Sequence, residues 1–94
     1  MKLTELPEGS AMFVEIASHP ELVELPQEDR LSFYQQKVDG YVEAVNFSAH
    51  GRNYVALTNE EGLLYGLPYN ELASHYTNVA LVGNVVIINS KDWK

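Results

Sequence analysis

The apolar residues of this chain gather in five short runs, at residues 11–17, 21–25, 41–45, 54–58 and 79–89. Each run is bounded by glycine, proline, asparagine or serine, which is typical of β-strands. The run at 79–89 is almost wholly apolar and rich in β-branched residues, so it predicts a central strand buried on both faces. Two glutamates within 21–25 favour an edge strand there, because a buried strand does not tolerate them.

A helical spacing is found between residues 27 and 38. Leu31, Tyr34 and Val38 fall on one helical face, and polar residues occupy the other faces. Gly40 is placed to end this helix in a left-handed conformation, which glycine adopts without a steric penalty.

A second, shorter helix is expected at 71–76, with Asn70 as its N-cap, because the asparagine side chain accepts a hydrogen bond from an unpaired amide of the first turn. Before this helix, Gly62 is expected to supply a positive φ in a tight turn, after which residues 63–65 return as a brief strand. Residues 46–53 are expected to form a longish loop between two strands.

Together these elements predict an α+β fold, with a mixed or antiparallel sheet of four to five strands and two helices packed on one face. The 94 residues suffice for one domain, residues 1–94. We expect its globular core at residues 10–89 and a polar tail at residues 90–94.

Composition narrows the classes of function. Thirteen acidic and six basic residues give a net charge of −7, which argues against direct binding to nucleic-acid phosphates. The chain has no cysteine, which excludes disulfides, a thiolate nucleophile and a cysteine zinc site. No stretch is typical of a secretory signal or a membrane span, so we expect a cytoplasmic protein that is not in a membrane.

Several blocks of the sequence point to a family. They are Leu31 and Tyr34, residues 38–45, residues 59–62, residues 66–70 and residues 82–84. Over residues 10–89, their order and spacing resemble the phage and bacterial family called domain of unknown function 3846. The resemblance implies a small phage-type accessory protein, acting in the cytoplasm of the host cell, rather than a metabolic enzyme.

Glu43 is the most suggestive carboxylate, since a strand would point it the same way as Tyr41 and Val45. A carboxylate among apolar neighbours is costly unless it is paired. It could act as an acid, a base or a ligand anchor, or it could pair with Lys37 or Arg52 at the rim of the sheet.

Other catalytic chemistry finds little support in the sequence. The three histidines share no metal-ligand spacing, so we predict no metal site and no cofactor. No serine lies in a nucleophile motif, and no glycine-rich loop is suited to hold a phosphate.

Six tyrosines are many for so short a chain. Tyrosine combines a large apolar ring with a polar tip, which favours it at protein interfaces. Tyr65 and Tyr69 flank residues 66–68 and would form a contact patch if they protrude; alternatively, they cover a small core.

The leading hypothesis is non-catalytic binding to a host protein, most simply the inhibition of a defence-type protein. An acidic rim formed by Glu60 and Glu61 would steer the approach to a basic surface, and a tyrosine such as Tyr69 would anchor the contact.

Two alternatives stay open at this point. The first is a homo-oligomeric sponge that sequesters a nucleotide-like signalling molecule, using Arg52, Asn70 and tyrosine rings. The second is an unidentified enzyme that uses Glu43 with a histidine.

Overall fold

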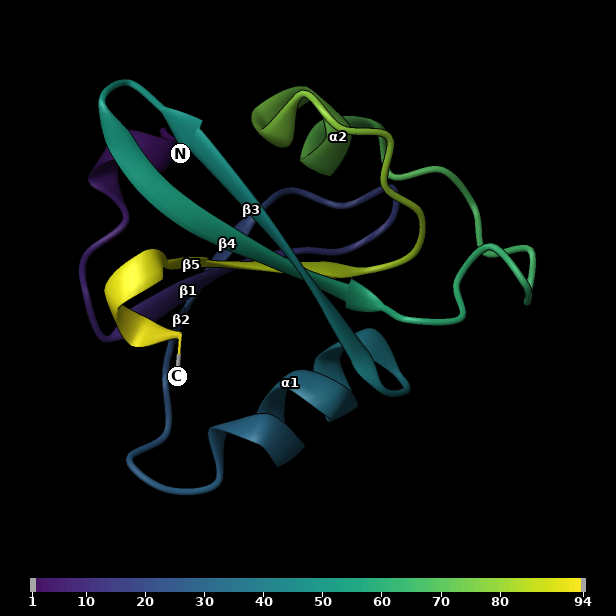
Figure 1. Cartoon of the computed structure of the whole chain (residues 1–94), viewed down its shortest axis with the longest axis horizontal. Coiled ribbons are helices and arrows are strands. Elements are labelled where there is room, and N and C mark those ends of the chain that lie inside the picture. Colours follow the sequence, from purple (N-terminus) through teal and green to yellow (C-terminus); the bar gives the residue numbers. More distant parts are fainter. Residues whose placement is uncertain (1, 94) are drawn as a thin grey trace.

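The structure, a computed structural model, describes residues 2–93. Five strands form one antiparallel sheet, against which two helices pack (Figure 1), and the predicted α+β fold is confirmed. The strands are β1 (Ser10–Val14), β2 (Glu21–Glu24), β3 (Val42–Ala49), β4 (Arg52–Asn59) and β5 (Val85–Asn89). The helices are α1 (Arg30–Val38) and α2 (Glu71–Thr77), accompanied by the short 3-10 helices η1 (Leu3–Glu5) and η2 (Ser90–Asp92).

Strand β5 lies in the middle of the sheet, whose strand order is β2-β1-β5-β4-β3. It pairs with β1 on one side and with β4 on the other, and residues 85–88 are fully buried. The predicted central strand and the predicted edge strand at β2 are therefore confirmed. Two strands are shorter than the apolar runs that predicted them: in the run at 11–17, β1 ends at Val14, and in the run at 79–89, β5 begins only at Val85.

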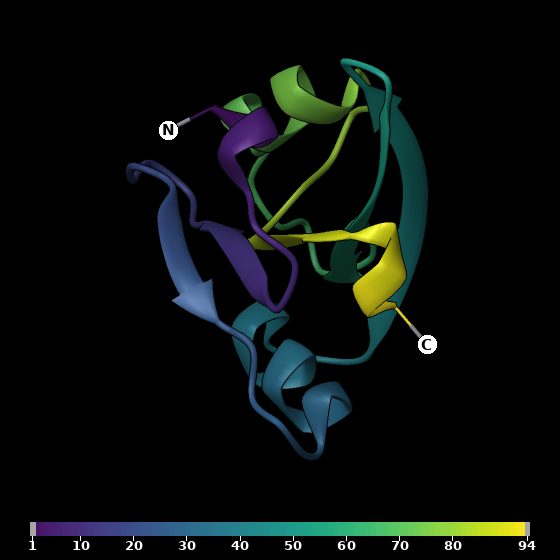
Figure 2. The same cartoon turned by 90° about the vertical axis from the view of Figure 1, so that its left-hand side faces the viewer.

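The two helices lie on opposite faces of the sheet, so the prediction that both pack on one face is wrong (Figure 2). Side chains alternate between the faces along β4 and β5: Val55 and Val86 face α1, whereas Ala56 and Ile87 face α2. Because both strands are apolar at successive positions, each face of the sheet needs a cover.

Helix α1 uses only part of its predicted apolar face. Tyr34 and Val38 are buried, whereas Leu31 in the first turn is 53% exposed. The helix begins at Arg30 rather than at residue 27, because Asp29 caps it by accepting a hydrogen bond from the Ser32 amide at 3.3 Å.

Strands β3 and β4 form a tight hairpin, so the predicted loop at 46–53 is wrong. The strands pair from Val42 opposite Asn59 to Ala49 opposite Arg52. Only His50 and Gly51 form the turn, with φ angles of 53° and 76°, and two successive positive φ angles match the twist of a two-residue hairpin. The polar residues that suggested a loop lie instead on the exposed positions of an edge strand.

The left-handed residue that ends helix α1 is Asp39, not Gly40. Asp39 takes the left-handed conformation, with φ 60°, whereas Gly40 does not. Gly40 is needed for space, because a Cβ there would lie 2.6 Å from Nδ2 of Asn59. That amide donates hydrogen bonds to the carbonyl oxygens of Val38 and Asp39, at 3.2 and 3.1 Å, and so satisfies the end of the helix.

The core extends beyond the predicted limits of 10–89. Leu3 and Leu6 are buried in the cluster on the α2 face. On the other face, Trp93 packs against the cluster of α1, with its ring centroid 6.1 Å from that of Tyr34. Residues 90–93 are therefore part of the folded unit rather than a polar tail.

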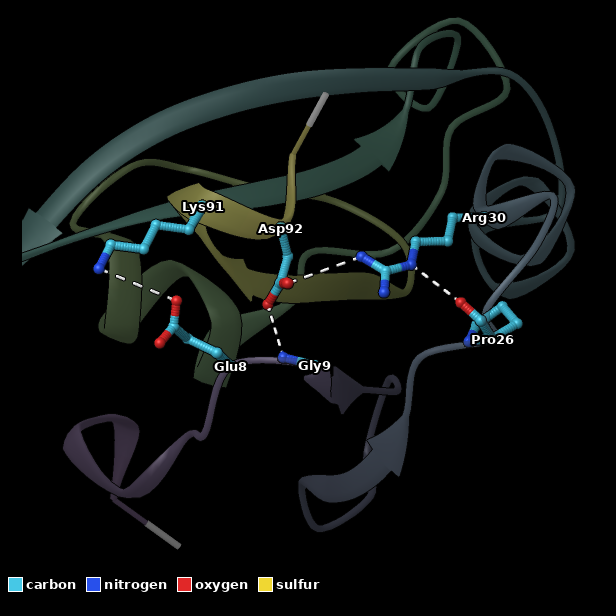
Figure 3. Close-up of polar contacts among 6 residues, drawn as sticks. All are labelled: Glu8, Gly9, Pro26, Arg30, Lys91 and Asp92. Carbon is cyan, nitrogen blue, oxygen red and sulfur yellow. Dashed lines mark hydrogen bonds and ion pairs between the residues drawn. The ribbon is translucent and has the colours of Figure 1, made fainter.

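A polar network fastens η2 to both the start of β1 and α1 (Figure 3). The Asp92 carboxylate accepts a hydrogen bond from the Gly9 amide at 2.9 Å and lies 3.6 Å from Nη1 of Arg30. Nε of Arg30 in turn donates to the Pro26 carbonyl oxygen at 2.9 Å. The exposed pair between Lys91 and Glu8, at 3.9 Å, adds little because water screens it.

Substitution of Gly40 by alanine tests the close approach of Asn59. Gly40→Ala is expected to lower the free energy of unfolding by about 1 to 3 kcal/mol, because the new methyl group displaces the amide that holds the helix end. Urea denaturation measures the change. Asp39→Gly is the matched control, and it should keep or raise stability because glycine relieves the left-handed strain of an exposed residue. Equal stability of Gly40→Ala and the unsubstituted chain would show that Asn59 is not held in place.

The buried hydroxyl of Tyr34 is expected to make the folded chain less stable at alkaline pH. Its hydroxyl is buried and has no hydrogen-bond partner among the described residues. Burial raises the pKa of Tyr34, Asp92 raises it further, and Arg30 opposes the shift. The neutral phenol is thus favoured in the folded state, so its stabilising contribution is complete below the unfolded-state pKa, near 10.0, and is lost as the pH rises above it.

The expected result is a steeper alkaline fall in unfolding free energy for the unsubstituted chain than for Tyr34→Phe, measured by urea denaturation at a series of pH values. At neutral pH Tyr34→Phe should be as stable or slightly more stable, because it removes a hydroxyl that is buried without a partner. Parallel alkaline curves would contradict the assignment of this titration to Tyr34.

Candidate functional site

The segment that leaves β4, here called the 60–69 loop, carries the two most exposed large apolar side chains among residues 2–93, those of Leu63 and Leu64. Leu63, Leu64, Tyr65 and Tyr69 are 85%, 78%, 64% and 57% exposed. Scattered apolar residues on a surface are normal, but a contiguous group marks an interaction site. The expected strand at 63–65 is wrong, because these residues lie in consecutive turns instead.

Hydrogen bonds within the 60–69 loop fix its path. The amide of Gly62 donates to the Asn59 carbonyl oxygen at 3.1 Å, and that of Tyr65 donates to Glu61 at 3.0 Å. The amide of Leu67 then closes the loop on the Gly62 carbonyl oxygen at 3.0 Å. The three exposed residues 63–65 are therefore presented by an ordered backbone.

Asn59 joins the loop to helix α1. Its Oδ1 accepts a hydrogen bond from the Glu61 amide at 2.8 Å, while its Nδ2 donates to the carbonyl oxygens at the end of α1. The Glu60 amide also donates to the carbonyl oxygen of Tyr41 at 2.8 Å, which places the exposed Tyr41 beside the loop. One buried amide thus fixes the start of the loop.

Leu67 packs beneath the loop against two glycines. A Cβ at Gly83 would lie 2.8 Å from Cδ1 of Leu67, and a Cβ at Gly62 would lie 2.8 Å from Cγ2 of Val82. Gly62 is not in the left-handed region, so the predicted reason for this glycine is wrong and close packing is the actual one. The Gly83 amide also donates to Pro68 at 2.8 Å, which ties the end of the loop to the segment before β5.

An open groove of about 510 Å³ borders the loop. Tyr65 and Leu67 line one side of it, and Ile16 and Asp39 line others. A side chain of a partner that contacts Tyr65 would therefore have room beside it.

Four of the predicted site residues come together in the loop. Glu60 and Glu61 are exposed at its start, and Tyr65 and Tyr69 are exposed further along. The hydroxyl of Tyr65 lies 3.4 Å from the Glu61 carboxylate, to which it donates a weak hydrogen bond. Acidic and aromatic groups thus share one exposed segment. Sequence reasoning missed Leu63 and Leu64, although their position between a turn and the Gly66-Leu67-Pro68 break was a signal of exposure.

Asn70 has a structural role. It is 2% exposed, and its side chain accepts a hydrogen bond from the Ala73 amide at 3.0 Å, which confirms the predicted N-cap of α2. Its Nδ2 donates to the carbonyl oxygens of Val14 and Gly83, at 2.9 and 2.8 Å. Both donors and the acceptor are thus occupied, which leaves no free group for a ligand.

Arg52 lies far from the other predicted residues. It begins β4, whereas the 60–69 loop follows the end of that strand, about 23 Å away at the usual rise of a strand. Its Nη1 donates to the Thr4 carbonyl oxygen at 2.9 Å. The structure therefore does not bring Arg52 together with Asn70 or the exposed tyrosines.

Glu43 is exposed on the edge strand β3, opposite Thr58, and the expected apolar surroundings are wrong. No ion pair of Glu43 is present among the described residues. The ammonium group of Lys37, one of its two expected partners, lies instead over the ring of Phe13, 4.7 Å from the centroid. Within residues 2–93, no group of three or more histidine or acidic side chains could hold a metal ion.

Comparison with known proteins gives a family and nothing further. A family model described as a domain of unknown function, DUF3846, matches residues 9–94 and so confirms the resemblance found in the sequence. No curated protein and no solved structure matches the chain significantly. In the part of the chain that the structure describes, no helix is long and apolar enough to cross a membrane.

Because Leu67 packs beneath the loop, its side chain is expected to keep the loop ordered. Leu67→Ala is expected to speed amide hydrogen exchange at residues 62–67 and to cost about 1 to 2 kcal/mol of stability, because the side chain is only half-buried. Leu63→Ala is the matched control, since Leu63 is highly exposed and its loss should change stability by less than about 0.5 kcal/mol. Unchanged exchange in Leu67→Ala would show that the hydrogen bonds alone order the loop.

Proposed function

We propose that this chain, which belongs to the family of domains of unknown function DUF3846, acts by non-catalytic binding to another protein through the 60–69 loop. The observation that carries the proposal is the exposure of three consecutive apolar residues, Leu63, Leu64 and Tyr65, on a hydrogen-bonded loop. Exposing them to water is unfavourable in the isolated chain, and a partner that covers them would recover that free energy.

The order of the loop supports a contact of useful affinity. Binding by a mobile segment loses conformational entropy, whereas a loop fixed by Asn59 and Leu67 has already lost most of it. Tyr65 offers a rigid ring with a polar tip, which is the kind of residue that contributes most to binding at protein interfaces.

The acidic residues of the loop support a basic partner surface. Glu60 and Glu61 precede the apolar residues directly and are exposed, and the whole chain carries a net charge of −7. Such charges speed the encounter with a positively charged surface, while the apolar centre slows dissociation.

The partner that we propose is a protein of the host cell, met in its cytoplasm. This step rests on the family resemblance, which implies a phage-type accessory protein. Occupation of a functional surface of a defence-type protein would inhibit it without any catalytic group.

The two other hypotheses receive less support from the site. A nucleotide sponge built from Arg52, Asn70 and tyrosines would need residues that lie apart or are already hydrogen-bonded. An enzyme based on Glu43 would place its carboxylate on an exposed strand edge, where water weakens its influence on a substrate.

The test compares two variants of the full chain as immobilised baits in host lysate. Leu63→Ser, Leu64→Ser and Tyr65→Ser combined should lose the captured partner, with binding to the purified partner weakened about a hundredfold or more. Leu22→Ser with Leu31→Ser is the matched control, because these leucines are about half exposed but lie elsewhere. Quantitative mass spectrometry identifies the partner, and surface plasmon resonance measures its affinity.

A charge variant separates the proposal from the sponge. Glu60→Gln with Glu61→Gln should slow association with the partner and reduce its dependence on salt, with little change in dissociation. A sponge for a phosphate-bearing ligand would instead be unaffected or bind more tightly, because two repelling carboxylates are gone. If the chain with serine at positions 63, 64 and 65 still captured the partner, the proposed site would be refuted.

A further inference from the structure

The outer edge of β3 is the longest unpaired strand edge of the described sheet. Strand β3 stands last in the strand order, spans eight residues and pairs only with β4. Among residues 2–93, no hydrogen bond joins another segment to the backbone of this edge. A row of free amide and carbonyl groups remains available to another strand.

The opposite edge of the sheet is protected, and β3 is not. Strand β2 has only four residues, its Glu21 and Glu24 are exposed, and Pro20 and Pro26 lie close to its ends. Short length, charge and proline are the usual means of preventing edge pairing. Strand β3 contains no proline and no lysine, and Glu43 is its only charged residue.

We propose that β3 pairs antiparallel with β3 of a second copy of this chain, about a two-fold axis that passes through Asn46 normal to the sheet. Such an axis sets Asn46 opposite Asn46, and Val45 opposite Phe47. The two five-stranded sheets then become one continuous sheet. This inference does not depend on the proposed function of the 60–69 loop.

The side chains of β3 favour this register. Val45 and Phe47 are half-buried on the α2 face, where they pack against the core cluster. In the dimer each Val45 meets a Phe47, and β-branched residues opposite aromatic ones stabilise antiparallel sheets. The same register keeps the two Glu43 carboxylates apart, because each lies opposite Ala49.

Neighbouring registers are less favourable. An axis through Val45 would set Glu43 opposite Phe47, which replaces an apolar pair by a charged one. An axis through Phe47 would shorten the ladder and set Glu43 opposite the turn residue Gly51. The axis through Asn46 pairs residues 43–49 of the eight-residue strand without setting Glu43 opposite an aromatic ring, and the two Asn46 side chains, exposed in the single chain, can hydrogen-bond to each other.

Salt should strengthen this dimer. Each copy carries a net charge of −7, so the two copies repel each other at a distance, and added salt screens the repulsion. The proposed contact of the acidic loop with a basic partner has the opposite dependence on salt, which separates the two interactions.

The experiment is sedimentation of the purified full chain over a range of micromolar concentrations, with Asn46 as the substituted position. We expect a concentration-dependent dimer for the unsubstituted chain. Asn46→Lys and Asn46→Asp should each weaken it by about tenfold or more, because like charges then face each other at the axis. An equimolar mixture of the two variants should restore the dimer, since lysine then faces aspartate.

Gln36→Lys is the matched control for Asn46→Lys, because Gln36 is exposed on α1 rather than on β3 and the substitution changes the net charge equally. It should leave the dimer intact, and circular dichroism confirms that every variant is folded. An unsubstituted chain that stays monomeric, or a dimer that persists in both Asn46 variants, would overturn the proposal. So would failure of the mixture to recover the dimer, or dimer loss caused by the serine substitutions at residues 63–65.

Discussion

Coverage of both faces of the sheet is the constraint on which the rest of this structure depends. With α1 on one face and α2 on the other, β4 and β5 must be apolar at successive positions, and their burial contributes a large share of the hydrophobic stabilisation. Both helices also bring backbone ends close to a buried sheet. Asn59 donates to the carbonyl groups at the end of α1, and Asn70 accepts from the Ala73 amide at the start of α2. Two buried side-chain amides thus complete the hydrogen bonding that the layered arrangement demands.

Much of this arrangement could be predicted from the sequence, and the failures have a common physical origin. Alternation and periodicity show that a side chain faces a core, but with two cores they do not show which one, so the sequence alone does not reveal that the helices lie on opposite faces. Asn46 and Ser48 resembled loop residues because the outer side of an edge strand meets water much as a loop does. The position of Gly40 after a helical pattern predicts a conformational role, whereas the residue that requires a glycine there, Asn59, is distant in the sequence.

In the candidate site, too, residues that are close in sequence were easier to predict as a group than residues joined by the fold. Glu60, Glu61, Tyr65 and Tyr69 were predicted together because they are close in sequence, and a loop that leaves the sheet keeps such residues together. Arg52 and Asn70 belong to contacts that only the folded topology creates, one with Thr4 and the other with β1 and the segment before β5. With both sheet faces covered by helices, the two contacts that we propose lie on the loop and on the free edge of β3.

The position of β5 also bears on how the chain folds as it is made. Of the five strands it is synthesised last, yet it lies between β1 and β4 and joins the two hairpins. Until it emerges from the ribosome, the β1–β2 and β3–β4 hairpins each have an unsatisfied inner edge, and isolated hairpins are only marginally stable. Folding therefore depends on contacts between residues far apart in the sequence, which slows the folding reaction. During this time the apolar strands are accessible to chaperones or to neighbouring nascent chains.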